Sequence, residues 1–542
     1  MERGYDYIVI GSGSAGAVIA ARLTEDPAVS VLLLEAGPRD RHPLQLMPLA
    51  FARVAAGRIG TWQYESEPEP GLCGRTLPIP RGRTLGGTSS INAMIAIRGN
   101  RLDYDDWAAQ GLDGWSYAEV LPYFKRLERD WRGAGQYHGG QGPVAITRMH
   151  GPEMVWEPLV QAAAAAGIPF CDDPNGAMQD GISHMESTTD GGRRASSARA
   201  YLHPAMGRPN LTIETGVLAR RIVVEAGRAR SVEYLQRGQV RRARATGEIV
   251  LCGGAYNSPQ LLLLSGIGPS DEIRAAGIEV VHDLPGVGRN LAEHPNIINE
   301  YILRGDGGLT PHLRFDRAVV AAARWFGGGK GVFAYTGTSA NVFARSLPGL
   351  DRPDIQMMTM PVSGGAGVWL PLLQRKPPSR ISVRTGFLHP ASRGWVKLRS
   401  NDPYDPPRIF NNMFGEPGDL EAMVRALKLS RAIHRQAPLS DLIREEAMPG
   451  VDVNDDGQLR GHIRRNAGHR SHPVGTCRMG TGEDAVVDAQ LKVRGIEGLR
   501  IADASVMPAL PSGNTNLPTI MIGEKAADML LGRCLPPERL AR

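Results

Sequence analysis

YDYIVIGSGSAG at residues 5–16, continued by AVIAARLTED at 17–26 and VLLLE at 31–35, is the stretch that decides the fold. The run at 5–10 is short and apolar, which predicts a strand, and the apolar spacing after residue 16 predicts a helix. Residues 31–34 predict a second buried strand that ends at Glu35. The chain therefore begins with a βαβ unit, which is typical of an α/β fold.

The turn between the first strand and the helix has glycines at positions 11, 13 and 16, in the spacing G-x-G-x-x-G. Such glycines permit a tight turn, let the backbone approach a pyrophosphate and allow the helix to pack on the strand. The helix N-terminus then faces the phosphates. The pattern predicts a dinucleotide site, although it does not choose between NAD and FAD.

Glu35 closes the second strand, where a carboxylate can accept hydrogen bonds from an adenosine ribose. The same carboxylate would repel a 2′-phosphate, so NADP is disfavoured. The alternative is a Gly-rich turn with an incidental glutamate.

The composition limits which classes of protein the chain can belong to. The chain has 542 residues, 42% of them hydrophobic and 22% charged, which is ordinary globular composition and suggests two domains. The net charge is +6, but acidic and basic residues are interleaved without a Lys/Arg block. We therefore expect no nucleic-acid partner.

The cysteines, the apolar runs and the N-terminus bear on location. The five cysteines are odd in number and contain no C-x-x-C pair, which favours a reducing compartment and argues against a zinc or other metal site. No run reaches the ~18 apolar residues of a membrane span, and no leader precedes the first strand. We expect a cytoplasmic protein, and peripheral attachment to a membrane through a surface patch stays compatible with this pattern.

In the rest of the chain, segments with clear helix or strand patterns alternate with segments that have no regular pattern. Residues 62–90 are rich in Pro, Gly, Arg and Thr and predict an extended functional loop, followed by two helical stretches. Strands are expected from residue 211 to 251, and EIVLCGGA followed by SPQLLLLSGIG predicts a second strand-to-helix switch. Residues 300–460 are irregular apart from the helical stretch DLEAMVRALKLSRAIHRQ. GLRIADASVMP and PTIMIGEKAADMLL predict a final strand and a closing helix.

Three further segments occur in a fixed order: GRTLGGTSSIN at 82–92, GAYNSP at 254–259 leading to SGIG at 265–268, and the C-terminal segment 472–514. Together with the βαβ unit they span nearly the whole chain, and in this order they resemble the glucose-methanol-choline (GMC) oxidoreductase family. Small residues at 82–92 would let that loop pass close under a planar ring. The resemblance implies that this ring is the isoalloxazine of FAD.

The resemblance implies the rest of the fold. It predicts a Rossmann-like FAD-binding domain, assembled from residues 1–155, 195–300 and 462–535. It also predicts a substrate-binding α+β domain with an antiparallel sheet, formed by residues 156–194 and 301–461.

The resemblance also assigns the cofactor contacts. Some family members attach the flavin through a histidine just before the asparagine of the first segment, and that position is Ile91 here, so we expect non-covalent FAD. In the family the turn at Asp503 contacts the diphosphate and the ribityl chain, although this aspartate could instead anchor a turn. The implied FAD contacts are Gly11, Gly13, Ser14, Ala15, Gly16, Glu35, Ala36, Arg83, Leu85, Gly86, Gly87, Thr88, Asn92, Ala93, Ala219, Asp503, Ala504, Asn514, Thr515 and Asn516.

Asn516 is expected to cap the closing helix and Pro518 to occupy its first position. The positive end of that helix would stabilise the negative charge of a reduced flavin.

Alcohol oxidation needs a base for the hydroxyl proton while the α-hydrogen leaves as hydride toward flavin N5. His472, in SHPVGTCRMG, matches the catalytic histidine of the family, and Asn514 matches its partner. An amide can hydrogen-bond the substrate oxygen but cannot act as a base, so the base is assigned to His472. We expect His469 to be structural or supporting, and Cys477 to pack rather than react. Tyr335, Phe343 and Trp395 could line a pocket, but core packing is the better expectation.

The resemblance implies FAD-dependent oxidation of a primary alcohol to an aldehyde. The partners would be a small alcohol substrate and an external acceptor, either a quinone or O2, with a dehydrogenase favoured over an oxidase. A flavin-containing lyase of the hydroxynitrile-lyase type and a light-driven decarboxylase are the alternatives. The oligomeric state is left as monomer or homodimer.

Overall fold

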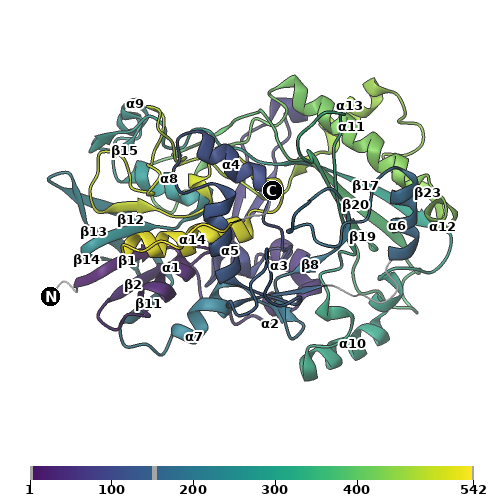
Figure 1. Ribbon diagram of the computed structural model, residues 1–542, viewed down its shortest axis with the longest axis horizontal. Coiled ribbons are helices and arrows are strands. Elements are labelled where there is room, and N and C mark those ends of the chain that lie inside the picture. Colours follow the sequence, from purple (N-terminus) through teal and green to yellow (C-terminus); the bar gives the residue numbers. More distant parts are fainter. Residues whose placement is uncertain (1–3, 149–154, 540–542) are drawn as a thin grey trace.

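The computed structural model describes residues 4–148 and 155–539. In Figure 1 one sheet and its helices occupy one half of the molecule, and a second sheet with its own helices occupies the other. The chain crosses between the halves several times, because strands of the first sheet come from the N-terminal, middle and C-terminal parts of the sequence.

The βαβ unit predicted at the N-terminus is confirmed. β1 (Gly4–Ile10) lies parallel to β2 (Val31–Glu35), and α1 (Gly16–Leu23) connects them. Every residue of β2 is buried, as expected for a strand covered on both faces. The Gly-rich turn therefore lies at the carboxyl end of a parallel sheet, which is the usual position of a nucleotide site.

The first sheet has the order β11-β2-β1-β14-β13-β12, with β25 also paired to β14. β11 (Leu211–Thr215) and β25 (Leu499–Ile501) are parallel to their neighbours. β12 (Val217–Glu225) and β13 (Arg228–Gln236) form an antiparallel hairpin. The long strand β14 (Gln239–Leu251) joins both parts, because its first half pairs with β13 and its second half with β1.

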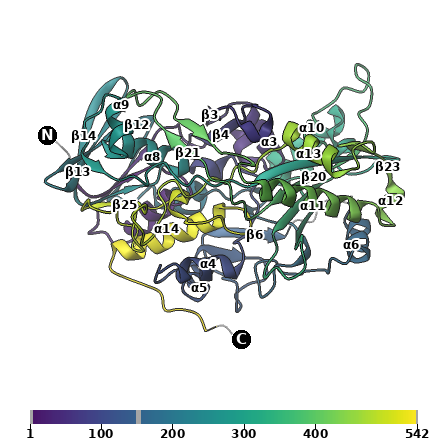
Figure 2. The ribbon, with the colours of Figure 1, turned by 90° about the horizontal axis from the view of Figure 1, so that it is seen from above.

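Helices cover the first sheet. α8 (Gly254–Leu264) follows β14, which confirms the second strand-to-helix switch. α14 (Asn516–Leu530) packs on α1 and on α5 (Tyr117–Leu127), and Figure 2 shows α5 and α4 (Arg101–Ala109) beyond α14.

The expected start of α14 is wrong, because the helix begins at Asn516 with Thr515 as its cap and Pro518 is its third residue. A proline fits there because the first four N–H groups of a helix have no partner within it.

The second sheet is antiparallel throughout, with the order β23-β17-β20-β19-β18-β7 and with β24 also paired to β17. α11 (Pro417–His434) packs on this sheet and contacts α6 (Trp156–Ala165) and α13 (Asp456–Asn466). The strands are β7 (Gly181–His184), β17 (Pro295–Leu303), β18 (Ala340–Ala344), β19 (Ile355–Met360), β20 (Arg380–Phe387), β23 (Ile443–Met448) and β24 (Gly468–His469). This agrees with the mixed α/β fold and antiparallel second sheet expected from sequence.

The strands also bear on the domain limits expected from sequence. β17 begins at Pro295 and belongs wholly to the second sheet, so a limit between residues 300 and 301 would divide a strand. β24 also joins the second sheet, although residues 462–535 were assigned to the FAD-binding domain. The division into domains otherwise stays a prediction.

The expectation of an extended loop over residues 62–90 is wrong in part. β3 (Thr61–Glu65) and β4 (Pro78–Gly82) form a two-stranded antiparallel ribbon there. Pro78 and Pro80 are untypical of a strand, so the sequence pattern did not predict β4. The strand can form because β4 pairs with β3 alone, and an edge strand tolerates prolines.

The remaining elements are α2 (Pro43–Leu46), α3 (Phe51–Ala56), β5 (Glu128–Asp130), β6 (Val144–Arg148), β8 (Glu186–Ser187), β9 (Thr189–Asp190), β10 (Arg193–Arg194), α7 (His203–Ala205), β15 (Ile267–Gly268), α9 (Ser270–Ala275), β16 (His282–Asp283), α10 (Phe315–Gly328), β21 (Trp395–Lys397), β22 (Arg408–Phe410) and α12 (Leu439–Leu442). Short 3-10 turns connect several of them.

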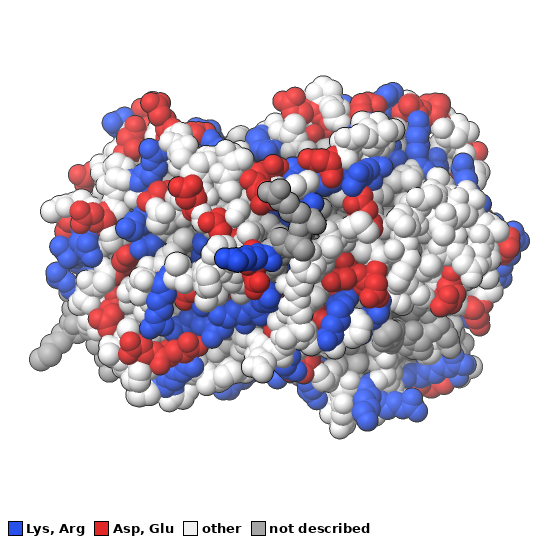
Figure 3. Space-filling model, in the orientation of Figure 1, with Lys and Arg blue, Asp and Glu red and all other residues white. Residues whose placement is uncertain are grey.

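Surface features complete the fold. Figure 3 shows Lys and Arg side chains interspersed with Asp and Glu over the face in view. Within residues 4–148 and 155–539, no helix combines the length and the apolar character that a membrane crossing requires.

Candidate active site

A cavity of about 940 Å³ lies between the two sheets. One end is lined by the carboxyl ends of β1 and β2 and by the start of β12, and the other by the faces of β17, β19 and β20. The cavity therefore connects the predicted dinucleotide site with the second sheet, on which a substrate would lie.

The three glycines of the first turn have different surroundings. A Cβ on Gly11, whose φ is +97°, would lie 2.4 Å from the carbonyl oxygen of Cys252, and a Cβ on Gly16 would lie 1.9 Å from the carbonyl oxygen of Gly11. A Cβ on Gly13 would meet protein only at 4.0 Å, because this glycine lines the cavity. Two glycines thus pack the turn, while the third lets a ligand approach the backbone.

Glu35 is fixed at the end of β2. Its Oε2 accepts hydrogen bonds from the Ser12 N–H at 3.0 Å and the Ser12 hydroxyl at 2.6 Å, and its Oε1 accepts from the Gly37 N–H at 2.8 Å. Burial raises the pKa of this carboxyl, although the three hydrogen bonds favour the charged form. One acceptor position on Oε1 remains for a ligand hydroxyl.

Asp503 holds a second turn against the first sheet. Its Oδ2 accepts from the Gly254 N–H at 2.8 Å and the Ser258 hydroxyl at 2.5 Å, and its Oδ1 accepts from the Ser505 N–H at 2.8 Å. The carboxylate therefore anchors its own turn and lines the cavity as well.

The loop over residues 82–93 packs against the Gly-rich turn. A Cβ on Gly87 would lie 2.8 Å from the Cα of Gly13, and the Gly86 N–H donates to the carbonyl of Ser12 at 3.0 Å. Ile91 lines the cavity at the position where some family members carry the flavin-linking histidine.

Most of the residues assigned to FAD line this one cavity. The exceptions are Gly16, Arg83, Leu85 and Gly86, which support the two turns instead of facing the cavity. Arg83, for example, lies over the Trp62 ring with its guanidinium carbon 4.3 Å from the ring centroid. Those that line it are Gly11, Gly13, Ser14, Ala15, Glu35, Ala36, Gly87, Thr88, Asn92, Ala93, Ala219, Asp503, Ala504, Asn514, Thr515 and Asn516.

His472 lies beyond the end of β24, and it meets Asn514 in the cavity wall. The Nδ2 of Asn514 is 3.0 Å from the Nε2 of His472, and the Nδ1 of His472 is 3.0 Å from the Nδ1 of His294. The carboxylate of Glu293 accepts the His472 N–H at 2.8 Å and the His294 N–H at 2.9 Å. Glu293 thus fixes the backbone of both histidines.

The contacts of the two histidines define their tautomers. Burial and nearby cationic groups lower the pKa of His472 and of His294 well below 6.5, so each ring is neutral at pH 7 and carries one proton. The Nε2 of His294 faces the carbonyl of Leu388 at 3.0 Å and must donate to it. Its Nδ1 is then an acceptor, so His472 donates through Nδ1. The Nε2 of His472 consequently keeps a lone pair directed at Asn514.

Glu293 was missed by sequence reasoning, as was His294. Burial raises the pKa of Glu293 to about 7, although Arg81 and the backbone N–H groups favour the charged form. These two residues immediately precede β17, and their position beside His472 depends on the pairing of β17 with β24. No local pattern in the sequence carries that information.

A hydrogen-bonded chain continues from Asn514 to the second sheet. The Gln356 amide donates to the Oδ1 of Asn514 at 3.3 Å, and Arg470 donates to the Gln356 side chain and to its carbonyl oxygen. Because the Asn514 oxygen accepts from Gln356, its amide nitrogen faces His472. The two residues assigned to catalysis are therefore oriented relative to each other by Gln356 of β19 and by residues that flank β17 and β24.

His469 lines the cavity but has no free nitrogen. Its Nε2 donates to the carbonyl of Pro78 at 2.9 Å, and its Nδ1 accepts from the Ser471 N–H at 3.0 Å. Burial lowers the pKa of His469 to about 4. Its contacts fit the supporting position expected from sequence.

Four other side chains that the sequence analysis considered do not line the cavity. Cys477 is fully buried in the main core, and burial raises the pKa of its thiol well above 9. Phe343 is buried, and Tyr335 packs against the same cluster. Trp395 packs on Phe410, and none of the three aromatic side chains lines the cavity.

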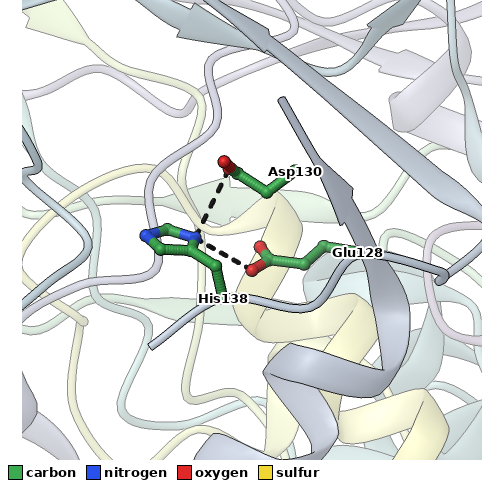
Figure 4. Close-up of side chains that lie close together, drawn as sticks. All are labelled: Glu128, Asp130 and His138. Atoms are coloured by element: carbon green, nitrogen blue, oxygen red, sulfur yellow. Dashed lines mark hydrogen bonds and ion pairs between the residues drawn. The ribbon is translucent and has the colours of Figure 1, made fainter. Parts of the chain in front are cut away.

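A cluster of ionisable groups lies outside this cavity, at Glu128, Asp130 and His138 (Figure 4). The Nδ1 of His138 is 3.0 Å from Glu128 and 3.4 Å from Asp130, and its Nε2 is 2.8 Å from Asp173. Burial opposes the charged form of His138, but hydrogen bonds to Asp173 and Glu128 outweigh it and raise its pKa to about 9. Arg98 also pairs with Glu128. With His138 protonated and Arg98 in place, the cluster is a buried ion-pair network.

The chain matches known proteins over most of its length. Two family models, both of GMC oxidoreductases, match residues 5–296 and 390–523. The chain is 42% identical over 548 residues to the mitochondrial choline dehydrogenase of Mus musculus, covering 97% of this chain and 89% of that protein. It is also 42% identical to the oxygen-dependent choline dehydrogenase of Pseudomonas fluorescens, covering 98% and 94%.

Solved structures have the same fold. Pyridoxine 4-oxidase from Mesorbium loti superposes with a TM-score of 0.86 at 32% identity, over 96% of this chain and 98% of that one. A formate oxidase variant from Aspergillus oryzae RIB40, studied for its FAD modification, superposes with a TM-score of 0.91 at 26% identity, over 98% of each chain.

Proposed function

Because the chain belongs to the GMC oxidoreductase family, we propose that it oxidises a primary alcohol to an aldehyde with FAD, and that His472 takes the hydroxyl proton. The family and its relatives make the chain an FAD-dependent oxidoreductase acting on CH–OH donors, and they do not favour a lyase. The observation that carries the assignment of the base is the neutral His472 ring, whose Nε2 lone pair faces Asn514 in the cavity.

The residues present fit FAD. Gly13 leaves the backbone open to a phosphate, Glu35 keeps an acceptor position for a ribose hydroxyl, and Thr88 and Asn92 also line the cavity. Bound FAD supplies the acceptor for the hydride that leaves the alcohol carbon. With Ile91 at the position of the flavin-linking histidine, attachment is proposed to be non-covalent.

The protein groups activate the hydroxyl. In the proposed complex the alcohol oxygen lies beside both side chains and accepts a hydrogen bond from the Nδ2 of Asn514. Its hydroxyl donates to the Nε2 of His472, where it takes the place of the Asn514 N–H. The Nδ1 of His294 accepts a hydrogen bond from the Nδ1–H of His472. This bond keeps the His472 proton on Nδ1, so the Nε2 lone pair stays available. It also stabilises the His472 ring once that ring becomes positively charged. The burial of both rings keeps bulk water from competing for the same lone pair.

The proposal also covers the electron acceptor, the cellular location and the oligomeric state. We propose reoxidation by an external acceptor, a quinone or O2, with a dehydrogenase favoured. We also propose a cytoplasmic location, in line with the free cysteines of the described chain, and a monomer or homodimer.

Anaerobic mixing with a panel of primary alcohols, followed by air, tests the proposed function. Bleaching of the flavin absorbance by an alcohol, with the matching aldehyde recovered in equal amount, is expected. Rapid recovery of the absorbance in air would identify an oxidase, and slow recovery that a quinone accelerates would identify a dehydrogenase. The absence of bleaching by every alcohol would overturn the proposal, and product formation that depends on blue light would point to a decarboxylase.

A further inference from the structure

Arg384 lies in the cavity wall that faces the proposed substrate position. It is on β20, where the sheet register pairs it with Ile298 on β17 and with Met358 on β19. All three residues line the cavity. The guanidinium-bearing side chain thus stands between two apolar partners in the sheet, and a cation at such a position requires an explanation.

No protein anion pairs with this guanidinium. Across residues 4–148 and 155–539, no carboxylate lies within hydrogen-bond or ion-pair distance of Arg384, and burial lowers the pKa of its side chain. Its charged neighbour is another cation, because Arg470 donates to the carbonyl oxygen of Arg384 at 2.9 Å. The side chain is half-buried without the partner that a desolvated guanidinium normally has.

The nearest carboxylate on the same face of the sheet is already engaged. Glu300, two residues beyond Ile298 on β17, binds Arg380 at 2.7 Å through Oε2 and accepts hydrogen bonds from Ser363 and Ser382 through Oε1. Arg380 and Arg384 are on the same face of β20, yet only Arg380 has an anionic partner in the protein. The unpaired guanidinium of Arg384 therefore lines the cavity, whereas the paired Arg380 lies outside it.

The charges along the cavity are unequally distributed. Its only carboxylates among the described lining residues are Glu35 and Asp503, and both lie at the end near the Gly-rich turn, where their own hydrogen bonds hold them. At the end near His472 the lining residues are cationic or neutral, and Asn296 presents an amide beside Ile298. None of the described residues that line this end offers a carboxylate with which to hold a quaternary ammonium group.

We propose that the alcohol oxidised at this site carries a carboxylate, and that Arg384 binds it. A guanidinium offers a planar pair of N–H donors that match a carboxylate, and the apolar neighbours Ile298 and Met358 would strengthen the pair by excluding water. The substrate is then a hydroxy acid whose hydroxyl reaches His472 while its carboxylate reaches Arg384. This inference rests on the proposed function and sets the chain apart from relatives that are named for choline, a cation.

The test compares three kinds of primary alcohol in anaerobic stopped flow with the holoenzyme: ω-hydroxy acids of three to six carbons, the unsubstituted alcohols of the same lengths, and choline. For at least one chain length, the hydroxy acid is expected to reduce the flavin with a bimolecular rate constant at least about tenfold above that of the matching alcohol, a difference of about 1.4 kcal/mol. Choline is expected to be slower than either.

Arg384→Gln should abolish this preference, so that the hydroxy acid and the matching neutral alcohol reduce the flavin of this variant at rates within about threefold of each other. The control Arg375→Gln should keep the preference. Arg375 is exposed and outside the cavity, and its replacement changes the net charge equally. If the Arg384 variant does not fold, carboxylates without a hydroxyl group should still inhibit oxidation of the neutral alcohol by the unaltered enzyme, competitively.

Equal rates for hydroxy acids and neutral alcohols at every length, or a preference that survives in Arg384→Gln, would overturn the inference and leave the proposed function standing. The absence of flavin reduction by alcohols of any charge would instead overturn the proposed function itself.

Discussion

Replacing His472 with alanine removes the imidazole that we propose accepts the hydroxyl proton, and no other described residue of the cavity lining is placed to replace it. The neighbouring His294 is fully buried and does not line the cavity. The Asn514 amide cannot take a proton, and both nitrogens of His469 are engaged, with Pro78 and Ser471. The full contribution of a positioned base should be lost, about 10²–10⁴ in rate. At ~1.36 kcal/mol per factor of ten, this is about 2.7–5.4 kcal/mol of barrier.

The assay is anaerobic stopped-flow reduction of the flavin by a primary alcohol at saturating concentration, with the FAD content of each variant measured first. His469→Ala is the matched control, because His469 lines the same cavity without a free lone pair, and its replacement should cost less than about tenfold. Added imidazole should partly restore the His472→Ala rate and have no effect on the control. Near-normal reduction by His472→Ala, or equal losses in both variants, would refute the assignment of the base.

Three further predictions follow from the same contacts. His294→Phe removes the acceptor of the hydrogen bond that the His472 Nδ1–H donates. Flavin reduction, measured by stopped flow, should slow about tenfold, which corresponds to the loss of one hydrogen bond, while the FAD content stays unchanged. An unchanged rate would contradict the assigned tautomers. His138 has a pKa raised from 6.5 to about 9, so its contribution to stability is complete below pH 6.5 and is lost as the pH rises through 9. The Tm should therefore fall more between pH 6.5 and 9.5 in the unaltered protein than in His138→Gln, and parallel curves would disprove this. Mild acid precipitation should release free FAD, since Ile91 cannot form the flavin link, and flavin retained on the denatured chain would count against non-covalent binding.

The local parts of the fold were predictable from sequence. The βαβ unit, the α8 switch and the helix α11 each have a periodic apolar pattern within one short stretch, and each was found where that pattern lies. The ribbon of β3 and β4 was not found, because Pro78 and Pro80 break the usual strand signal.

The candidate site was predictable only where a motif carries it. Gly13, Glu35, Asp503, His472 and Asn514 lie in motifs, and the structure brings all of them to one cavity.

Residues that act through non-local pairing were missed. His294 meets His472 across 178 positions of sequence, and Arg384 reaches the cavity only because of its register with Ile298 and Met358. Such contacts depend on which strands pair, and the period-2 pattern of a single strand does not specify its neighbours. A cation within ISVRTGF was the one local sign available for Arg384.

The most direct test of the central claim is the deuterium isotope effect on anaerobic flavin reduction, measured with a primary alcohol carrying deuterium on its hydroxyl-bearing carbon. If the α-hydrogen leaves that carbon as hydride, reduction of the flavin should slow severalfold with the deuterated alcohol. Equal rates of bleaching with both alcohols, under conditions in which substrate binding is shown not to limit the rate, would contradict hydride removal from the alcohol carbon.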